Sequence, residues 1–400
     1  MRRSRLALLA LVALAAVDQA VLHTALADGR FLGQIVAPFD PPVFIEPQLR
    51  HLADARRIVA GDDELRAQSI FDQELGWCPR PSSNGFGARF DALGARASTK
   101  PHARAKPAGV RRVLTFGGSF TMGMEVGDTE AWPARVEAGL GDVEVVNLGV
   151  AGYGLDQGLL RFRRDGPGLA PDAVWFGLMP QASLRVSTHY APAYYRWATM
   201  AAFKPRFLPA GGPDDTGLRL IANPVNGHED YVRLLSDQEA FLDAIGATDL
   251  WVRRAPAAFA PRGSSPLHWS AATRLALTLH EARGRDRAAW LQDPESEIYV
   301  VMRNLLLAFA TEARAAGATF RIVVLPSRAD LVLRAEAGAG FWERLLADLG
   351  ERGVESFDCS PALVEAGALT DDGLWMPGSH YSARGNDVVA AALIAAGLPR

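Results

Sequence analysis

The sequence predicts an α/β fold in which helices cover both faces of a parallel sheet. From about residue 109 onward, short apolar runs alternate with segments of helical periodicity. Strands separated by helices pair in parallel, because each helix carries the chain back to the same end of the sheet. With 400 residues, 49% hydrophobic and 22% charged, the chain has the composition of a globular protein with a large core.

Four apolar runs are predicted as strands of this sheet, at residues 112–116, 143–146, 173–178 and 320–325. Between about residues 187 and 293 the strand pattern is lost, and proline-interrupted loops and helices replace it. We expect this stretch to be an insertion over one end of the sheet, where it would shape a substrate site. Helices are predicted at residues 132–140, 157–164, 296–315, 340–349 and 387–396.

Residues 1–27 are predicted to be a targeting segment. Three arginines among the first five residues precede an apolar run at 6–17, which is shorter than the roughly 20 residues that a spanning helix needs. Ala25 and Ala27 are small residues at the positions that a signal peptidase reads, so cleavage is expected before Asp28. The alternative is an uncleaved membrane anchor. In both cases the body of the protein is expected outside the cytoplasm, secreted, periplasmic or anchored through this segment.

The remaining chain is predicted to form a lead-in and a main domain. Residues 28–108 are interrupted repeatedly by proline, contain one helical segment at 46–58, and are expected to pack on the main domain at 109–400. The two cysteines, Cys78 and Cys359, argue against a disulfide scaffold. Outside the cytoplasm a disulfide between them is chemically permitted, and two unrelated buried thiols are the alternative.

Charge and histidine spacing exclude two classes of partner. The 42 lysines and arginines against 45 aspartates and glutamates leave a formal charge of -3, which creates no overall field for a polyanion. Nucleic acid is therefore not expected as a partner. None of the seven histidines other than His380 has a second ligand at metal-binding spacing, so these are expected to be surface or helix-cap histidines, and no metal or cofactor is expected.

The most informative stretch ends the first predicted strand. Gly117 and Gly118 precede Ser119, and two glycines permit a tight turn that leaves a hydroxyl at the carboxyl edge of a parallel sheet. Doubly wound folds bind their ligands at that edge, and a following helix N-terminus favours developing negative charge. A plain Gly-Ser turn is the alternative for this stretch taken alone.

Three further segments are expected at the same edge. The second strand is followed by a glycine-rich exit that contains Gly152, and the third by a segment with the Gln181 amide and Arg185. His380 lies in a loop that precedes the last predicted helix. Together the four segments offer a nucleophile, backbone donors, an amide donor and a base, which is the set that acyl transfer needs.

In these four segments and in this order, the sequence resembles the SGNH (GDSL-type) hydrolases. The resemblance covers about residues 111–396 without the insertion, is closest in wording to exported bacterial members, and extends to alginate O-acetyltransferases. It implies a flavodoxin-like three-layer sandwich with a central parallel sheet. It also implies that Ser119 is the nucleophile, that His380 is the general base, and that Gly152 and Gln181 donate to the oxyanion.

Two sequence blocks depart from the family pattern. Gln181 stands where the family has asparagine, and Pro377 and Gly378 stand where it has the aspartate of the triad. The acid is therefore missing locally, and an orienting acid can contribute roughly 10⁴ in kcat. Asp371 or Asp372 would supply it by folding back, or a backbone carbonyl would hold the histidine in a Ser-His dyad.

The function expected from these residues is that of an exported esterase acting on a carbohydrate or small acyl ester. A polysaccharide O-acetyltransferase is the alternative, and a non-catalytic binding module of the same fold is an alternative of another class. Arg185 is expected to face the substrate or to fix its loop by an ion pair. The insertion has four aromatic residues that would line a sugar-binding cleft or form a hydrophobic patch, namely Tyr190, Tyr194, Tyr195 and Trp197.

Overall fold

The computed structural model describes most of the 400 residues. The predicted cleavage site at Ala25 to Asp28 falls largely outside the described residues. The described residues are 2–25, 30–31, 34–35, 46–195, 198, 202–259, 270–283 and 287–397.

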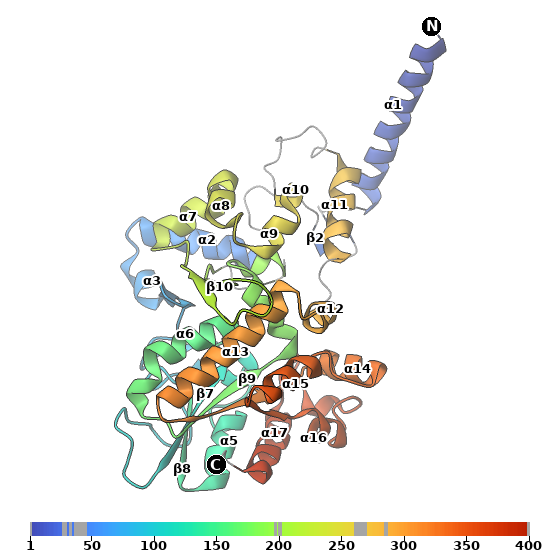
Figure 1. The fold of residues 1–400 in the computed structure, drawn as a ribbon. Coiled ribbons are helices and arrows are strands. Elements are labelled where there is room, and N and C mark those ends of the chain that lie inside the picture. Colours follow the sequence, from blue (N-terminus) through green and yellow to red (C-terminus); the bar gives the residue numbers. More distant parts are fainter. Residues whose placement is uncertain are drawn as a thin grey trace. The chain divides into compact units, whose positions relative to one another are not determined.

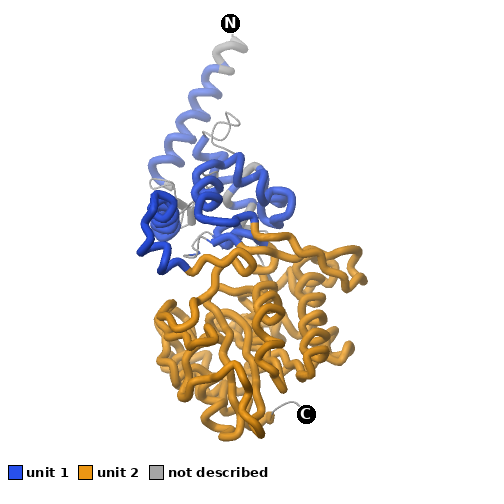
Figure 2. The backbone as a smooth tube through the Cα atoms, turned by 90° about the vertical axis from the view of Figure 1, so that its left-hand side faces the viewer, with its two compact units in different colours: residues 1–69, 188–203, 224–286 blue, residues 70–187, 204–223, 287–400 orange. Residues whose placement is uncertain are grey.

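The chain forms two compact units, which Figure 2 shows in different colours. Unit 1 comprises residues 1–69, 188–203 and 224–286, and unit 2 comprises residues 70–187, 204–223 and 287–400. This division differs from the expected one. The expected lead-in at 28–108 is split after Ser69, and its first part belongs with most of the insertion.

Unit 2 contains a sheet of five parallel strands in the order β8-β7-β9-β12-β13 (Figure 1). Counted along the chain this order is 2-1-3-4-5, the flavodoxin-like arrangement of a doubly wound fold. The predicted three-layer sandwich around a parallel sheet is confirmed. The strands are β7 (Arg111–Gly117), β8 (Val143–Asn147), β9 (Ala173–Leu178), β12 (Thr319–Val324) and β13 (Glu355–Asp358).

Helices cover both faces of the sheet. On one face α5 (Trp132–Leu140) packs beside α17 (Ala383–Ala396), and on the other α6 (Leu155–Asp165) packs beside α13 (Glu297–Ala315), as Figure 1 shows. Side chains alternate between the two faces because successive residues of a strand point in opposite directions. Trp175 of β9 accordingly belongs to the core under α5 and α17, where it stacks on Trp132. The neighbouring Phe176 packs on Phe309 of α13.

An edge strand and a hairpin are among the elements that the sequence prediction missed. Strand β13 is an edge strand whose residues Glu355 to Asp358 are partly or fully exposed, so it has no apolar run to mark it. The insertion, predicted to lack strands, contains a hairpin of β10 (Arg206–Pro209) and β11 (Leu218–Ile221). The helix expected at 387–396 begins earlier, at Ala383, because the Ser382 hydroxyl caps it by accepting from the Gly385 amide.

Unit 1 is mostly helical in its described residues. No helix of the described chain has the length and hydropathy to cross a membrane. The predicted targeting segment forms α1 (Arg2–Ala20) and η1 (Val21–Ala25). The other elements are β1 (Arg30–Phe31), β2 (Gln34–Ile35), α2 (Glu46–Val59), α3 (Asp63–Gln68), η4 (Ala191–Ala193), α7 (His228–Ser236), α8 (Gln238–Ile245), α9 (Leu250–Arg254), α10 (Pro256–Phe259) and α11 (Ala271–Arg283).

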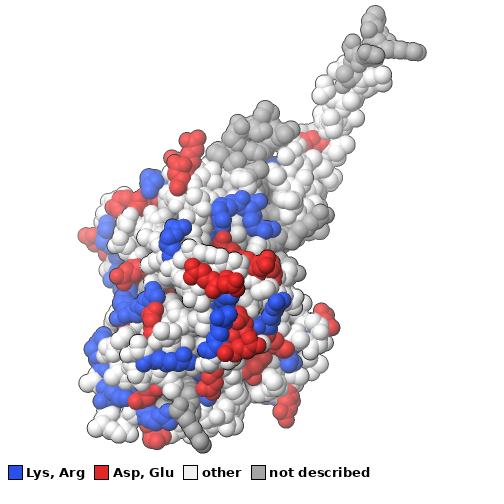
Figure 3. All heavy atoms as spheres, viewed as in Figure 1, with Lys and Arg blue, Asp and Glu red and all other residues white. Residues whose placement is uncertain are grey.

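The remaining elements of unit 2 are short strands and helices around the sheet. Cys78 and Cys359 are both free thiols and form no disulfide. On the face shown in Figure 3, basic and acidic side chains are interspersed. The elements are β3 (Phe71–Asp72), β4 (Gly76–Trp77), β5 (Asn84–Gly85), β6 (Ala88–Arg89), α4 (Ser119–Met122), η2 (Pro167–Leu169), η3 (Pro180–Ser187), α12 (Arg287–Gln292), α14 (Arg328–Ala337), α15 (Glu343–Glu351), α16 (Ser360–Glu365) and η6 (Asp372–Leu374).

His102, which was expected at the surface or in a helix cap, is buried between two carboxylates. Its Nε2 lies 2.7 Å from Glu137 Oε1, and its Nδ1 lies 3.7 Å from Asp91 Oδ2. Burial alone lowers the pKa of an imidazole, but the two carboxylates outweigh it and raise the pKa of His102 to about 9. The folded state therefore holds a buried imidazolium at neutral pH.

We predict that His102→Gln lowers the free energy of unfolding by about 3 kcal/mol at pH 6, because it leaves Glu137 without its cation. A pKa raised on folding stabilises the protein fully below about 6.5, and this contribution is lost as the pH rises through about 9. Urea unfolding at pH 6 and pH 9.5 should show the difference between the two proteins shrinking. A difference that stays constant or grows would contradict a buried imidazolium.

Candidate active site

Ser119 stands at the carboxyl edge of the sheet because two glycines end β7. Gly117 has a φ of 149°, and a Cβ there would lie 2.8 Å from the Gly177 carbonyl oxygen of β9, so only glycine fits. Gly118 is the N-cap of α4, and Ser119 is the first residue of that helix. Its amide therefore lies in the first turn, where a helix offers no internal acceptor. A hydroxyl and a backbone donor without an acceptor in its own helix thus share one position.

His380 lies within hydrogen-bond distance of Ser119. The imidazole Nε2 is 2.9 Å from the Ser119 Oγ, which suits direct proton transfer. The ring packs at 5.2 Å from the Phe120 ring, and the His380 carbonyl accepts from the Met376 amide. The residue before it, Ser379, has a φ of 72°. These contacts fix the direction in which the imidazole points.

The opposite ring nitrogen contacts Glu125, which the sequence prediction did not include. His380 Nδ1 lies 2.5 Å from Glu125 Oε2, and Glu125 Oε1 accepts from the Gly378 amide at 2.9 Å. With Nδ1 donating to the carboxylate, Nε2 presents its lone pair to Ser119. Burial raises the pKa of Glu125, but the hydrogen bonds from His380 and Gly378 outweigh it, and the pKa is lowered overall. The ionised carboxylate therefore completes a Ser-His-Glu arrangement.

Gly378 is tied to Glu125 by geometry. A Cβ at position 378 would lie 2.6 Å from Glu125 Oε1, which is closer than two unbonded atoms approach. The carboxylate of Glu125 thus fills the space that a side chain at position 378 would need. The glycine at position 378 was interpreted as the loss of the triad acid. It instead leaves space for an acid from another loop. A glutamate six residues after Ser119, in the same strand-exit loop, was the signal available in the sequence.

The two aspartates expected as displaced acids lie elsewhere. Asp371 Oδ2 is 2.6 Å from Arg384 Nη1, and Asp371 Oδ1 accepts from the Gly373 amide. Asp372 forms an ion pair with Arg328. The structure brings neither aspartate to the histidine. The dyad alternative also needs correction, because a carboxylate rather than a backbone carbonyl is bonded to the ring.

The expected oxyanion loop lies against α4. The Val150 amide donates to the Gly117 carbonyl at 3.0 Å, and Gly152, with a φ of 83°, follows two residues later. A Cβ on Gly152 would lie 3.1 Å from the Trp77 ring, whose Nε1 donates to the Ala151 carbonyl at 3.0 Å. Trp77 therefore braces this loop from the lead-in segment. A donor at Gly152 is held close to the strand exit that presents the serine.

The expected role of Gln181 as an oxyanion donor stays a prediction. Gln181 is exposed at the start of η3, and among the described residues no hydrogen bond joins its side chain to Ser119 or His380. Arg185 Nη1 donates to the Tyr153 carbonyl at 2.8 Å. Within the described chain no carboxylate pairs with Arg185, so a carbonyl, not an ion pair, ties its loop to the Gly152 loop.

The aromatic residues expected to line a sugar cleft do not act as one set. Tyr190 is fully buried in unit 1 and stacks on Phe203 with ring centroids 4.7 Å apart, which is a core contact. Tyr195 is 53% exposed. Trp197 lies outside the described residues. Tyr190 is thus part of a hydrophobic core.

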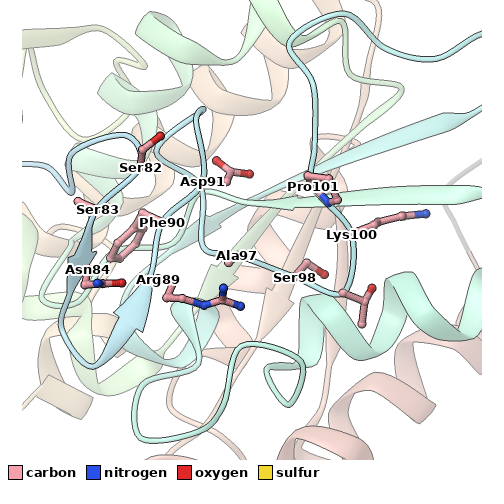
Figure 4. A pocket seen from close by; sticks show the side chains of 11 residues that line it. Ser82, Ser83, Asn84, Arg89, Phe90, Asp91, Ala97, Ser98, Lys100 and Pro101 are labelled. Atoms are coloured by element: carbon pink, nitrogen blue, oxygen red, sulfur yellow. The ribbon is translucent and has the colours of Figure 1, made fainter.

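A pocket of about 450 Å³ lies between the β5–β6 hairpin and residues 97–101 (Figure 4). Most of the residues that line it have polar side chains, among them Asn84, Asp91 and Ser98. Neither Ser119 nor His380 lines it. The pocket is therefore separate from the catalytic residues.

No protein-family model matches the chain, and no curated protein matches it in sequence. Among solved structures it is similar to a member of the lipolytic protein G-D-S-L family from Veillonella parvula DSM 2008, with 12% identity over 72% of this chain and 98% of that chain and a TM-score of 0.34. It is also similar to a GDSL-like lipase from Bacteroides thetaiotaomicron VPI-5482, with 13% identity over 74% and 91% and a TM-score of 0.35. An acetyl xylan esterase matches at 11% identity over 72% and 100%, with a TM-score of 0.26. None of these assigns a substrate to this chain.

We predict that Glu125→Gln lowers kcat for ester turnover by about 10²- to 10⁴-fold, because the amide no longer stabilises the imidazolium. Asp371→Asn, an acid of the neighbouring loop, should cost less than about tenfold and serves as the matched control. Steady-state kinetics of the two folded variants checks this. Equal losses in both would remove the distinction that the structure draws.

We further predict that Gly378→Ala lowers kcat with little change in thermal stability. The new methyl group would displace the end of a flexible glutamate side chain, which costs little folding energy but separates Glu125 from His380. Gly373→Ala is the control, because its methyl group would meet the Asp371 side chain instead. Kinetics and melting temperatures should separate the two. Full activity in Gly378→Ala would show that the contact with Glu125 is dispensable.

Proposed function

We propose that the protein is an exported serine esterase of the SGNH type that hydrolyses a carbohydrate ester or a small acyl ester. The observation that supports this most is the hydrogen-bonded series Ser119–His380–Glu125 at the carboxyl edge of a doubly wound sheet. The side chains of His380 and Glu125 are 17% and 25% exposed, and Ser119 is 6% exposed. Export is proposed on the arginine-rich, apolar N-terminal segment.

The first half of the reaction forms an acyl-enzyme. His380 Nε2 takes the proton of the Ser119 hydroxyl while the oxygen attacks the ester carbonyl carbon. The carbonyl oxygen becomes an oxyanion, which the amides of Ser119 and Gly152 stabilise by hydrogen bonding. Glu125 stabilises the imidazolium that forms. Collapse expels the alcohol, which takes the proton from His380 as it leaves.

The second half releases the acyl group. Water loses a proton to His380 as it attacks the acyl-enzyme, and a second tetrahedral oxyanion forms at the same position. When it collapses, Ser119 recovers its proton from His380 and a carboxylic acid leaves. Transfer to an alcohol would follow the same steps, so the proposal of hydrolysis depends on water being the acceptor.

The proposal predicts that a serine-directed fluorophosphonate labels the protein and that a short-chain nitrophenyl ester is turned over. Ser119→Ala should lose the label and lower turnover by at least about 10³-fold while remaining folded. Ser183→Ala, which removes a buried hydroxyl of η3, is the matched control and should retain both. Labelling that survives in Ser119→Ala would move the nucleophile elsewhere. A folded native protein with neither label nor turnover would favour the binding-module alternative.

Product analysis separates the esterase from an acetyltransferase. An acetylated sugar incubated with the protein should release acetate in equal amounts with and without a second sugar as acceptor. Acetylated acceptor formed in preference to acetate would identify a transferase. Both outcomes require Ser119, so the control variants are the same.

A further inference from the structure

We propose that Arg96 is a positioning residue that holds Glu125 in the conformation its contact with His380 requires. The inference rests on the proposed function where turnover is the readout. It concerns a residue of the lead-in segment that precedes the catalytic strand, and it adds a third part of the chain to the site. Arg96 touches no reacting atom, so it acts through Glu125.

Glu125 has a backbone conformation that is unfavourable for a residue with a side chain. Its φ is 71°, in the left-handed region that residues with a Cβ rarely occupy. Such a residue keeps this conformation only where its surroundings determine it. The carboxylate reaches His380 from this conformation, so whatever determines the backbone also determines the contact.

Arg96 fixes the backbone on both sides of Glu125 by hydrogen bonds. Its Nη1 donates to the carbonyls of Met122, at 2.8 Å, and Gly123, at 2.5 Å, and its Nη2 donates to the carbonyl of Val126 at 2.5 Å. The three acceptors lie immediately before and after the pair Met124 and Glu125. A planar guanidinium therefore closes the loop that contains the acid, with the residue only 1% exposed.

Arg96 is itself fixed to the sheet. Its amide donates to the Asn147 carbonyl at the end of β8, at 2.8 Å. The Asn147 side-chain amide donates to the Thr121 carbonyl of α4 at 2.9 Å. The arginine, the end of β8 and the nucleophile helix thus form one hydrogen-bonded unit. A buried guanidinium whose residue is hydrogen-bonded to the end of a strand can hold a strained loop, whereas an exposed side chain could not.

The same residue type elsewhere in unit 2 gives a matched control. Arg112, at the start of β7, is fully buried, pairs with Glu144, and donates to the carbonyls of Ala103 and Leu169. It lies at the end of β7 opposite to the end that leads to Ser119. Arg112→Lys should lower the stability of the fold without affecting the loop that contains Glu125.

The test is a double-mutant cycle of Arg96→Lys with Glu125→Gln. A single ammonium cannot bridge three carbonyls, so Arg96→Lys should lower kcat by at least about tenfold in the native background. In the Glu125→Gln background the same change should lower kcat by less than about twofold, because the contact is already lost. Arg112→Lys should lower the melting temperature in both backgrounds. It should cause no loss of kcat that depends on Glu125. Equal loss from Arg96→Lys in both backgrounds would overturn the proposal.

A second readout does not depend on turnover. The proton on His380 Nδ1 that is hydrogen-bonded to Glu125 should give a downfield ¹H resonance, assigned by its loss in Glu125→Gln and His380→Ala. Arg96→Lys should broaden or abolish this resonance, and Arg112→Lys should retain it. If the native chain turns over no ester, the proposed function fails while this comparison still decides the role of Arg96. An unchanged resonance in folded Arg96→Lys would overturn that role.

A further variant covers the case in which Arg96→Lys does not fold. Asp128 Oδ1 lies 3.6 Å from Arg96 Nη2, and Asp128 is half-buried in the loop that follows Glu125. Asp128→Asn removes this ion pair, together with the 2.6 Å pair between Asp128 and Arg89, and leaves Arg96 in place. It should produce a smaller loss of kcat that again depends on Glu125. It should also produce a smaller broadening of the His380 Nδ1 proton resonance. A loss that is independent of Glu125 would again contradict the proposal.

Discussion

The hydrogen bond between His380 Nδ1 and Glu125 is the interaction on which the candidate site depends. An imidazole without an acceptor at Nδ1 can take either tautomer and can rotate away from the serine. With the carboxylate in place, Nε2 must accept, and it lies 2.9 Å from the Ser119 Oγ. Gly378 has no side chain and so leaves the space for this bond, and the left-handed backbone at Glu125 directs the carboxylate toward His380.

The fold explains how residues far apart in sequence meet at this bond. Ser119 and Glu125 both belong to the exit of β7, and His380 lies in the loop that enters α17, which packs on the same side of the sheet as α5. Parallel strands place their exits at one edge, so two loops supply the three side chains. The Gly152 loop, braced by Trp77, comes from the neighbouring strand β8.

Much of this fold could be predicted from the sequence. The strands β7, β8, β9 and β12 match their predicted ranges within about one residue, because each is a buried apolar run. The meeting of Ser119 and His380 could be anticipated because each lies in a recognisable segment. Glu125 was not assigned, because its contact with His380 spans 255 positions and its place six residues after Ser119 does not by itself identify the acid. The edge strand β13 was missed because it is exposed and has no apolar run. Only its pairing with β12 defines it as a strand.

A crystal structure of the protein with a phosphonyl group on Ser119 would test the central claim most directly. The account predicts Glu125 within hydrogen-bond distance of His380 Nδ1, and the phosphonyl oxygen close to the amides of Ser119 and Gly152. It also predicts that Asp371 remains paired with Arg384. A structure in which Glu125 turns to solvent and an aspartate or a carbonyl receives the Nδ1 proton would contradict the account.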